Sequence, residues 1–255
     1  MDVVQEAPVL LTGMQKTSAQ THNLPPAVVV GGVAYGDRSR IVRLLTEAHG
    51  VVPLWVPNAS KSKALWHPMA IVEVVDLRQP KSGGLWSGRD WKRGAPQLAY
   101  RREPARSAVG FFIAEVLSTS LEEGAPASEV FHLARQAAHW LETAAEIQWI
   151  HVKFMADFVS ALGLLPEEPP TNESPFDIAT GEYVPEELAP KTAMDAATVK
   201  GMREIVGMEF GAVHRLNWPR DRRKALVLGA HRFVQAQLGK SRELKSYDVL
   251  EALFA

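Results

Sequence analysis

The stretch from Ala27 to Pro68 constrains the fold most, because it contains three short extended segments separated by turns. Val28, Val29 and Val30 are β-branched residues, which favour a pleated, half-buried surface. Turns follow at Tyr35-Gly36-Asp37 and at His49-Gly50, where glycine adopts positive φ without strain. Strands so close together in sequence predict an antiparallel meander, and hence a small sandwich or barrel.

One segment of this stretch fits two kinds of secondary structure. Ile41, Leu44 and Leu45 belong to an apolar run that suits a strand, but their spacing of i, i+3 and i+4 also suits one face of a helix. Periodicity cannot distinguish the two in so short a run, so the pattern alone leaves both open.

Further along the chain, the hydrophobic period changes from that of strands to that of helices. Residues 69–77 alternate and predict a fourth strand, and residues 85–98 predict a short fifth one. Helical spacing of apolar residues predicts helices at about 104–124, 126–141, 147–163, 194–210, 218–238 and 246–254. Asn217 is the candidate N-cap of the fifth of these helices. Residues 176–184, with Gly181 in the turn, predict a small β-hairpin.

The composition argues against several classes of protein. The chain has no cysteine, which excludes disulfides, Cys-ligated zinc and thiol catalysis. No segment approaches the ~20 apolar residues that cross a membrane, and Asp2 and Glu6 stand where a signal peptide is basic. No P-loop, GxGxxG loop or HExxH motif is present. A cytoplasmic protein without enzymatic activity, cofactor or metal is therefore expected.

The charge is unevenly distributed, although the net charge is only −1. Residues 24–106 carry 13 Lys and Arg against 6 Asp and Glu, whereas residues 107–255 carry 14 against 21. A basic module beside an acidic one indicates a charged partner. A solvated surface is the alternative, and the charge excess alone does not decide between them.

The order of these motifs resembles the RecO family of DNA repair proteins. Its members open with an apolar strand, a Tyr-Gly-acid turn, a Ser-x-Ile-Val segment, a Thr-x-x-x-Gly turn and a basic loop before a proline. Here these features are Val28–Val30, Tyr35-Gly36-Asp37, Ser39–Val42, Thr46–Gly50 and Lys61-Ser62-Lys63 before Pro68. The late Leu244-Lys245-Ser246 is also similar, so the likeness covers most of residues 25–255.

The resemblance implies an α+β protein with two domains, and it favours a strand at Ile41–Thr46. An N-terminal OB-fold β-barrel at 25–100 is followed by an α-helical domain at 104–255, with a small β-hairpin insertion at about 166–190. Residues 1–24 are then an N-terminal extension that is partly disordered. Many RecO proteins hold a Cys-ligated zinc site where this chain has the hairpin, and the loop at 58–63 has fewer cations than is usual for the family.

The resemblance further implies a recombination mediator of the RecF pathway, associated with the nucleoid in the cytoplasm. RecO proteins bind single- and double-stranded DNA and anneal complementary strands. With RecR they promote loading of RecA on DNA coated with the single-stranded DNA-binding protein SSB, whose acidic C-terminal tail recruits them. One alternative is a protein–protein adaptor whose OB module does not bind DNA. Another is an OB-fold protein that prefers RNA to DNA; contacts to the 2′-hydroxyl group would distinguish the two polymers.

Candidate DNA-binding residues lie in the OB module, because OB-folds bind single strands with a basic groove and stacking aromatic rings. They are Arg38, Arg40, Arg43, Lys61, Lys63, Lys81, Arg89, Lys92, Arg93, Trp66 and Trp91. If Ile41–Thr46 is a strand, Arg38 and Arg40 share one face of the sheet and Arg43 lies on the other. Trp55 is expected in the core, whereas Trp66, Trp86 and Trp91 fit either the core or a stacking surface.

A groove for the SSB tail needs cations for its carboxylates and a pocket for its terminal ring. The candidates in the helical half are Lys153, Arg222, Arg223, Arg232 and Lys245. For each of them, a solvated charge on a helix surface is the alternative.

Overall fold

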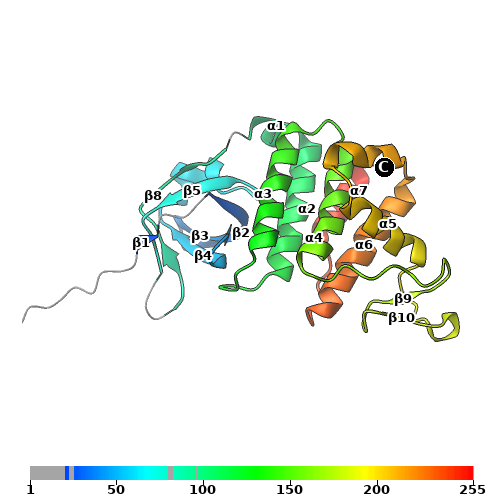
Figure 1. The fold of residues 1–255 in the computed structure, drawn as a ribbon. Coiled ribbons are helices and arrows are strands. Elements are labelled where there is room, and N and C mark those ends of the chain that lie inside the picture. Colours follow the sequence, from blue (N-terminus) through cyan, green and yellow to red (C-terminus); the bar gives the residue numbers. More distant parts are fainter. Residues whose placement is uncertain (1–20, 23–25, 80–82, 96, 255) are drawn as a thin grey trace, which may run out of the picture.

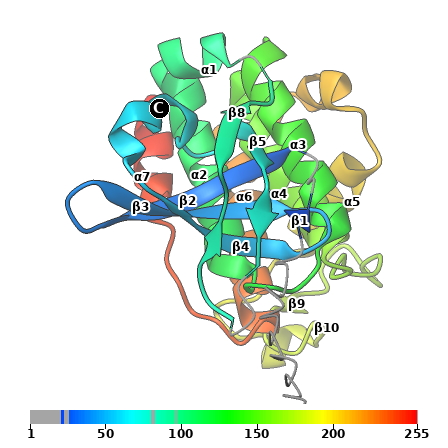
Figure 2. The ribbon, with the colours of Figure 1, turned by 90° about the vertical axis from the view of Figure 1, so that its left-hand side faces the viewer.

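A computed structural model describes residues 21–22, 26–79, 83–95 and 97–254 of the chain. Its N-terminal half is one strongly curled sheet with the strand order β1-β6-β7-β4-β3-β2-β5-β8 (Figure 2). The strands are β1 (Thr21–His22), β2 (Ala27–Tyr35), β3 (Ser39–Thr46), β4 (Gly50–Val56), β5 (Ile71–Val75), β6 (Leu77–Arg78), β7 (Trp86–Ser87) and β8 (Asp90–Arg93). All neighbouring pairs are antiparallel except β4 and β7, which are parallel.

The segment from β7 to β8 produces the curl. Leu54 of β4 pairs with Trp86, whereas Val72 of β5 pairs with Arg93, so one short segment contacts strands from both sides of the sheet. Gly88 lies between β7 and β8, where a Cβ atom would come within 2.6 Å of the Val74 side chain. The sheet therefore encloses its own core, which contains the inward-facing residues of β2 to β5.

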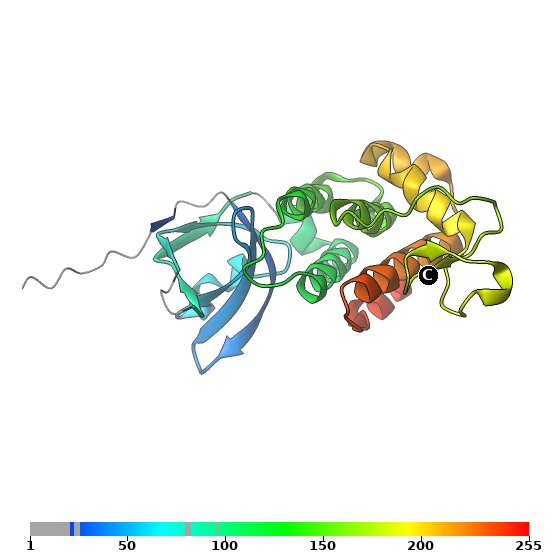
Figure 3. The same ribbon diagram turned by 60° about the horizontal axis from the view of Figure 1, so that its bottom comes forward.

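The C-terminal half is helical (Figure 1). Its α-helices are α1 (Leu98–Arg102), α2 (Pro104–Ser120), α3 (Ser128–Thr143), α4 (Ile150–Ala161), α5 (Ala196–Val206), α6 (Arg220–Gln237) and α7 (Lys245–Leu253). Short 3₁₀ helices are η1 (Ala59–Leu65), η2 (Ile147–Trp149), η3 (Glu186–Leu188) and η4 (Phe210–Leu216). The antiparallel pair β9 (Phe176–Asp177) and β10 (Glu182–Tyr183) lies at the far end from the curled sheet (Figure 3). No helix in the described residues is both long and apolar enough to cross a membrane.

A second hydrophobic core is shared by the two halves. Side chains alternate along a strand, so β3 directs Leu44 into the curled sheet and Leu45 toward the helices. Leu45 joins Val28, Val51 and the buried residues of α2 and α3 in a single cluster. Helices therefore cover the part of the outer face of the meander that carries these residues.

Several sequence predictions are corrected by the structure. The strand that starts at Ala27 continues to Tyr35, and its register against β3 shifts between Val29 and Gly31. Thr21–His22, predicted as part of the extension, pairs with β6. The basic loop forms η1, and Asn217 ends η4 in the left-handed conformation instead of capping α6.

Candidate nucleic-acid interface

A row of cations lies along one side of the curled sheet, where the β2–β3 turn meets η1. We define the basic ridge as Arg38, Lys61, Lys63, Arg93 and Arg101. The Ala59 amide donates a hydrogen bond of 2.9 Å to the Arg38 carbonyl, which brings η1 beside the β2–β3 turn. Arg93 Nη2 donates to the Ala64 carbonyl over 3.3 Å, which places β8 at the other end of η1.

The basic ridge offers uncompensated positive charge. The side chains of Arg38, Lys61 and Lys63 are exposed, and none of them forms an ion pair or hydrogen bond with the described part of the chain. The same holds for Arg101 on α1. Phosphate groups can therefore replace water around these cations without breaking a contact within the protein.

Two tryptophans hold the ridge in place. Trp66 is only 4% exposed; its Nε1 donates to Ser62 Oγ over 2.8 Å, so its ring anchors η1 to the core of the sheet. Trp91 of β8 meets the Trp66 ring edge-on, with 5.4 Å between the ring centroids. The prediction that Trp66 stacks on bases does not fit this burial. By contrast, Trp55, which was expected in the core, is 37% exposed on the outer face of β4.

Other predicted DNA-binding cations have partners within the protein. Arg43 Nη1 donates to the Ser118 carbonyl over 2.9 Å, and Arg40 Nη2 donates to the Gly32 carbonyl over 3.0 Å. Lys92 Nζ lies 2.7 Å from Glu73, and Arg89 Nε lies 3.9 Å from Asp76. Their charges are therefore partly compensated. Lys81 lies outside the described residues.

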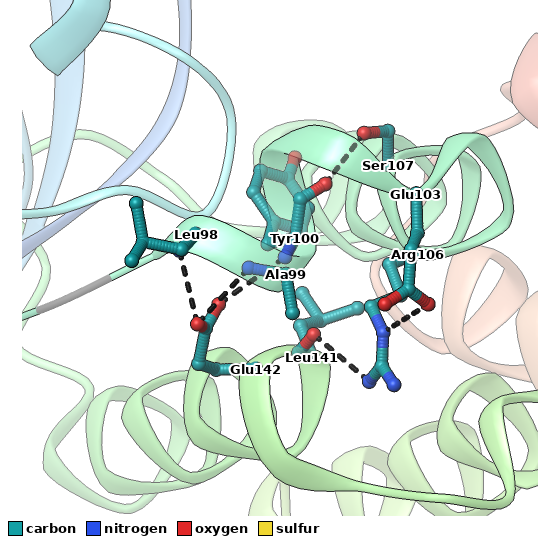
Figure 4. Close-up of polar contacts among 8 residues, drawn as sticks. All are labelled: Leu98, Ala99, Tyr100, Glu103, Arg106, Ser107, Leu141 and Glu142. Carbon is teal, nitrogen blue, oxygen red and sulfur yellow. Dashed lines mark hydrogen bonds and ion pairs between the residues drawn. The ribbon is translucent and has the colours of Figure 1, made fainter.

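Hydrogen bonds hold α1, which carries Arg101, against α2 and α3 (Figure 4). Glu142 of α3 accepts hydrogen bonds from the amides of Leu98, Ala99 and Tyr100 over 2.9, 3.0 and 3.2 Å. Burial alone would raise the pKa of Glu142, but these amide donors and the positive charge of Arg106 lower it overall. The Glu142 carboxylate thus satisfies the free N–H groups at the start of α1.

The helical half separates the residues predicted to bind an SSB tail. Lys153 is 5% exposed, and its Nζ lies 2.7 Å from Asp157 and 3.1 Å from the Ile205 carbonyl. Such a buried, satisfied ammonium is not available to a partner, so the surface role predicted for Lys153 is wrong. The guanidinium carbons of Arg222 and Arg223 lie 3.9 Å and 5.2 Å from the ring centroids of Trp218 and Trp149.

Arg232 lies elsewhere, in a groove of about 570 Å³ between α6 and α7. The groove is also lined by Leu228, Leu244 and three further cations, Lys224, Lys240 and Arg242. The sequence patterns did not single out Lys240 and Arg242, which follow α6 in a connecting segment. Lys245 is exposed at the start of α7, where its amide donates to Glu115 Oε1 over 3.0 Å.

Comparison with known proteins relates this chain to DNA repair proteins. Residues 101–248 match the model of the family "Recombination protein O C terminal". Proteins named DNA repair protein RecO are similar over nearly the whole chain. The protein of Flavobacterium psychrophilum is 22% identical over 90% of this chain and 98% of its own length. That of Phocaeicola vulgatus is 24% identical over 89% of this chain and 97% of its own length.

These matches confirm the resemblance predicted from the motifs of the meander. The family model covers more than half of the chain, and the relatives extend the similarity into the curled sheet. The chain therefore belongs to the RecO family of DNA repair and recombination proteins.

Proposed function

We propose that this chain is a non-enzymatic recombination mediator that binds single- and double-stranded DNA along the basic ridge. It anneals complementary strands and, with RecR, promotes loading of RecA on SSB-coated DNA. The observation that carries the DNA-binding part is the set of four exposed, unpaired cations Arg38, Lys61, Lys63 and Arg101. Several unpaired cations on one surface favour binding to the phosphate backbone, independent of base sequence.

The proposal includes an OB-fold at 25–100, a helical domain at 104–255 and a hairpin insertion at about 166–190. Support for the OB-fold comes from the strand order, in which β2 to β5 and the segment 86–93 curl around one core. OB-folds are five-stranded, partly open barrels that bind single strands on one face.

The test of DNA binding is fluorescence anisotropy of labelled single- and double-stranded DNA over a series of salt concentrations. We expect Lys61→Glu/Lys63→Glu to weaken binding to both polymers. For single strands, the slope of log K against log salt should fall by about 1.4, since each lost phosphate contact removes ~0.7. The matched control is Lys191→Glu/Arg215→Glu, which makes the same charge change at exposed residues of the helical half. Absence of binding at low salt would favour the adaptor, and tighter binding of RNA would favour an RNA-binding protein.

We propose the groove between α6 and α7 as the site for the acidic tail of SSB. Arg232 and Arg242 form no ion pair with the described residues and can bind carboxylates, while Leu228 and Leu244 supply an apolar wall for the terminal ring. Glu243, Asp248 and Glu251 also line the groove and oppose an acidic ligand. Titration of a labelled SSB-tail peptide tests this site: Arg232→Glu should abolish binding and Lys191→Glu should not. Equal binding by both variants would place the tail elsewhere.

A further inference from the structure

A hollow of about 430 Å³ adjoins the basic ridge where η1, α1 and α2 meet. It is lined by Lys63, Ala64, His67, Tyr100, Arg101, Ser107 and Phe111. Two residues of the ridge, Lys63 and Arg101, thus lie at its walls, and neither has an acidic partner in the described part of the chain. A pocket of this volume is large enough for a small planar ligand.

Phe111 is the unusual residue of this hollow. Its side chain is 51% exposed, whereas its neighbours Phe112 and Ile113 are fully buried in the shared core. The phenyl ring therefore contributes little to the stability of α2. An exposed ring beside two unpaired cations matches the chemistry of a nucleotide, which combines a flat base with a charged phosphate.

The wall behind Phe111 is held rigidly. Tyr100 Oη donates to the Pro68 carbonyl over 2.8 Å, and the His67 ring stacks on the Tyr100 ring at a centroid distance of 5.1 Å. Gly110 permits this packing, because a Cβ atom there would lie 2.3 Å from Tyr100 Cε2. The hollow is therefore preformed, which lowers the entropic cost of binding.

The positive charge of the hollow comes from Lys63 and Arg101, and not from His67. Burial lowers the pKa of His67; the hydrogen bond with the Pro68 carbonyl opposes this shift, and the charges of Arg93 and Arg101 add to it. A histidine with a pKa below 6.5 is mostly neutral at pH 7.

We propose that this hollow binds one unstacked nucleotide of a single DNA strand, with its base on the Phe111 ring and its phosphates beside Lys63 and Arg101. The inference rests on the proposed function, because the strand reaches the hollow along the basic ridge. A double helix keeps its bases stacked inside, so its phosphates can contact the cations but its bases cannot reach Phe111. Phe111 thus distinguishes single from double strands, whereas the ridge binds both.

The test compares Phe111→Ala with the wild type by anisotropy, using a labelled thymidine oligonucleotide and a duplex of the same length. Loss of one base-stacking contact should weaken single-strand binding by about 5- to 150-fold, while duplex affinity stays within about twofold. Leu98→Ala is the control, because Leu98 is 60% exposed on α1 and does not line the hollow. Phe111→Trp should preserve single-strand affinity, and Phe111→Leu, which keeps helix propensity and apolar bulk, should not.

A strand that lacks bases provides the decisive second measurement. On a deoxyribose-phosphate oligomer of the same length, wild type and Phe111→Ala should bind equally, since only phosphate contacts remain. Unchanged single-strand affinity of Phe111→Ala, or equal losses for duplex and single strand, would overturn the proposal. If Lys61→Glu/Lys63→Glu still weakens binding in that case, the proposed function stands and only the nucleotide site fails. If the wild type binds neither polymer, both fail.

Discussion

The guanidinium of Arg43 donates a hydrogen bond of 2.9 Å to the main-chain carbonyl of Ser118, and so joins β3 to the last turn of α2. Its Nε also lies 3.5 Å from Glu123. The Ser118 carbonyl lies in the last turn of α2, where carbonyl groups lose their intrahelical donors. Arg43 is therefore a contact between the two halves of the molecule and not a free cation.

We expect Arg43→Ala to lower the free energy of unfolding by about 1–3 kcal/mol, because the charged hydrogen bond is lost and the carbonyl remains partly buried. Arg38→Ala is the control, since the Arg38 side chain is exposed and forms no hydrogen bond or ion pair with the described residues. It should change stability by less than about 0.5 kcal/mol. Urea denaturation measures both, and equal midpoints for the two variants would contradict the structural role of Arg43.

Gly50 should tolerate no side chain. Its φ is +58°, and a Cβ atom would lie 1.9 Å from the Ala125 carbonyl oxygen, between β4 and the segment before α3. Gly50→Ala should therefore destabilise the protein by more than about 2 kcal/mol. Gly36→Ala provides the comparison: φ is +63° there, but no atom of the described residues lies within 4 Å of an added Cβ, so only the backbone cost of ~1 kcal/mol applies. Similar melting temperatures for the two variants would show that the close approach at Gly50 is absent in solution.

Glu142 should stabilise the protein in a pH-dependent manner. Its folded-state pKa lies below the usual 4.5. The stabilisation is therefore complete above pH 4.5 and is lost as pH falls through the folded-state pKa. Glu142→Ala should lower the free energy of unfolding by about 1–3 kcal/mol at pH 7 and by less at pH 3. Glu122, which is exposed and unpaired with the described residues, is the control position. A cost for Glu142→Ala that does not depend on pH would rule out the carboxylate as the cause.

His151 should make the fold sensitive to acid. Burial, with a smaller contribution from Arg223, lowers the pKa of His151 from 6.5 to about 3. Below pH 6.5 the unfolded chain binds a proton at this position and the folded chain does not, so stability falls as pH falls. In the wild type, this difference should lower the free energy of unfolding by up to about 1.4 kcal/mol for each pH unit between pH 6 and pH 4, and His151→Leu should remove this decrease. His139→Leu, at an exposed position, should leave the pH dependence as it is in the wild type.

Replacing Trp66 should destabilise the protein more than replacing Trp55, although the sequence predicts Trp55 in the core and Trp66 among the DNA-binding residues. Trp66→Ala should destabilise the protein by about 3–5 kcal/mol, because the ring is buried beneath η1. Trp55→Ala should cost less than about 1.5 kcal/mol, since its ring is partly exposed. Calorimetric melting temperatures measure the difference. A larger loss for Trp55→Ala would mean that the outer face of β4 is covered in solution.

Sequence patterns predicted strands and helices well where one physical signal dominated. The Val28–Val30 run and the glycine turns led to the meander, and helical spacing led to α2, α3, α4 and α6. Phe111 was missed, although a local signal existed: it lies outside the apolar stripe that includes Val109 and Phe112. Lys153 was misplaced because the Ile205 carbonyl becomes its neighbour only when α4 packs against α5, although its other partner, Asp157, lies four residues along the same helix.

The sequence by itself determined the family, most of the longer strands and helices, and the half of the chain in which positive charge collects. Local propensity and the spacing of apolar residues are properties of short segments, so they can be recognised in the sequence without knowledge of the fold. Only the tertiary structure decided which cations are free and which rings are exposed. Both faces of the meander carry apolar residues. The alternation of side chains along each strand assigns residues to one face or the other, but it does not predict which face packs against α2 and α3. Contacts between residues distant in sequence, such as the hydrogen bond from Arg43 to the Ser118 carbonyl, set the orientation of the two halves. In this orientation Leu45 is buried and Arg43 is paired, whereas Lys61 and Lys63 stay exposed to solvent.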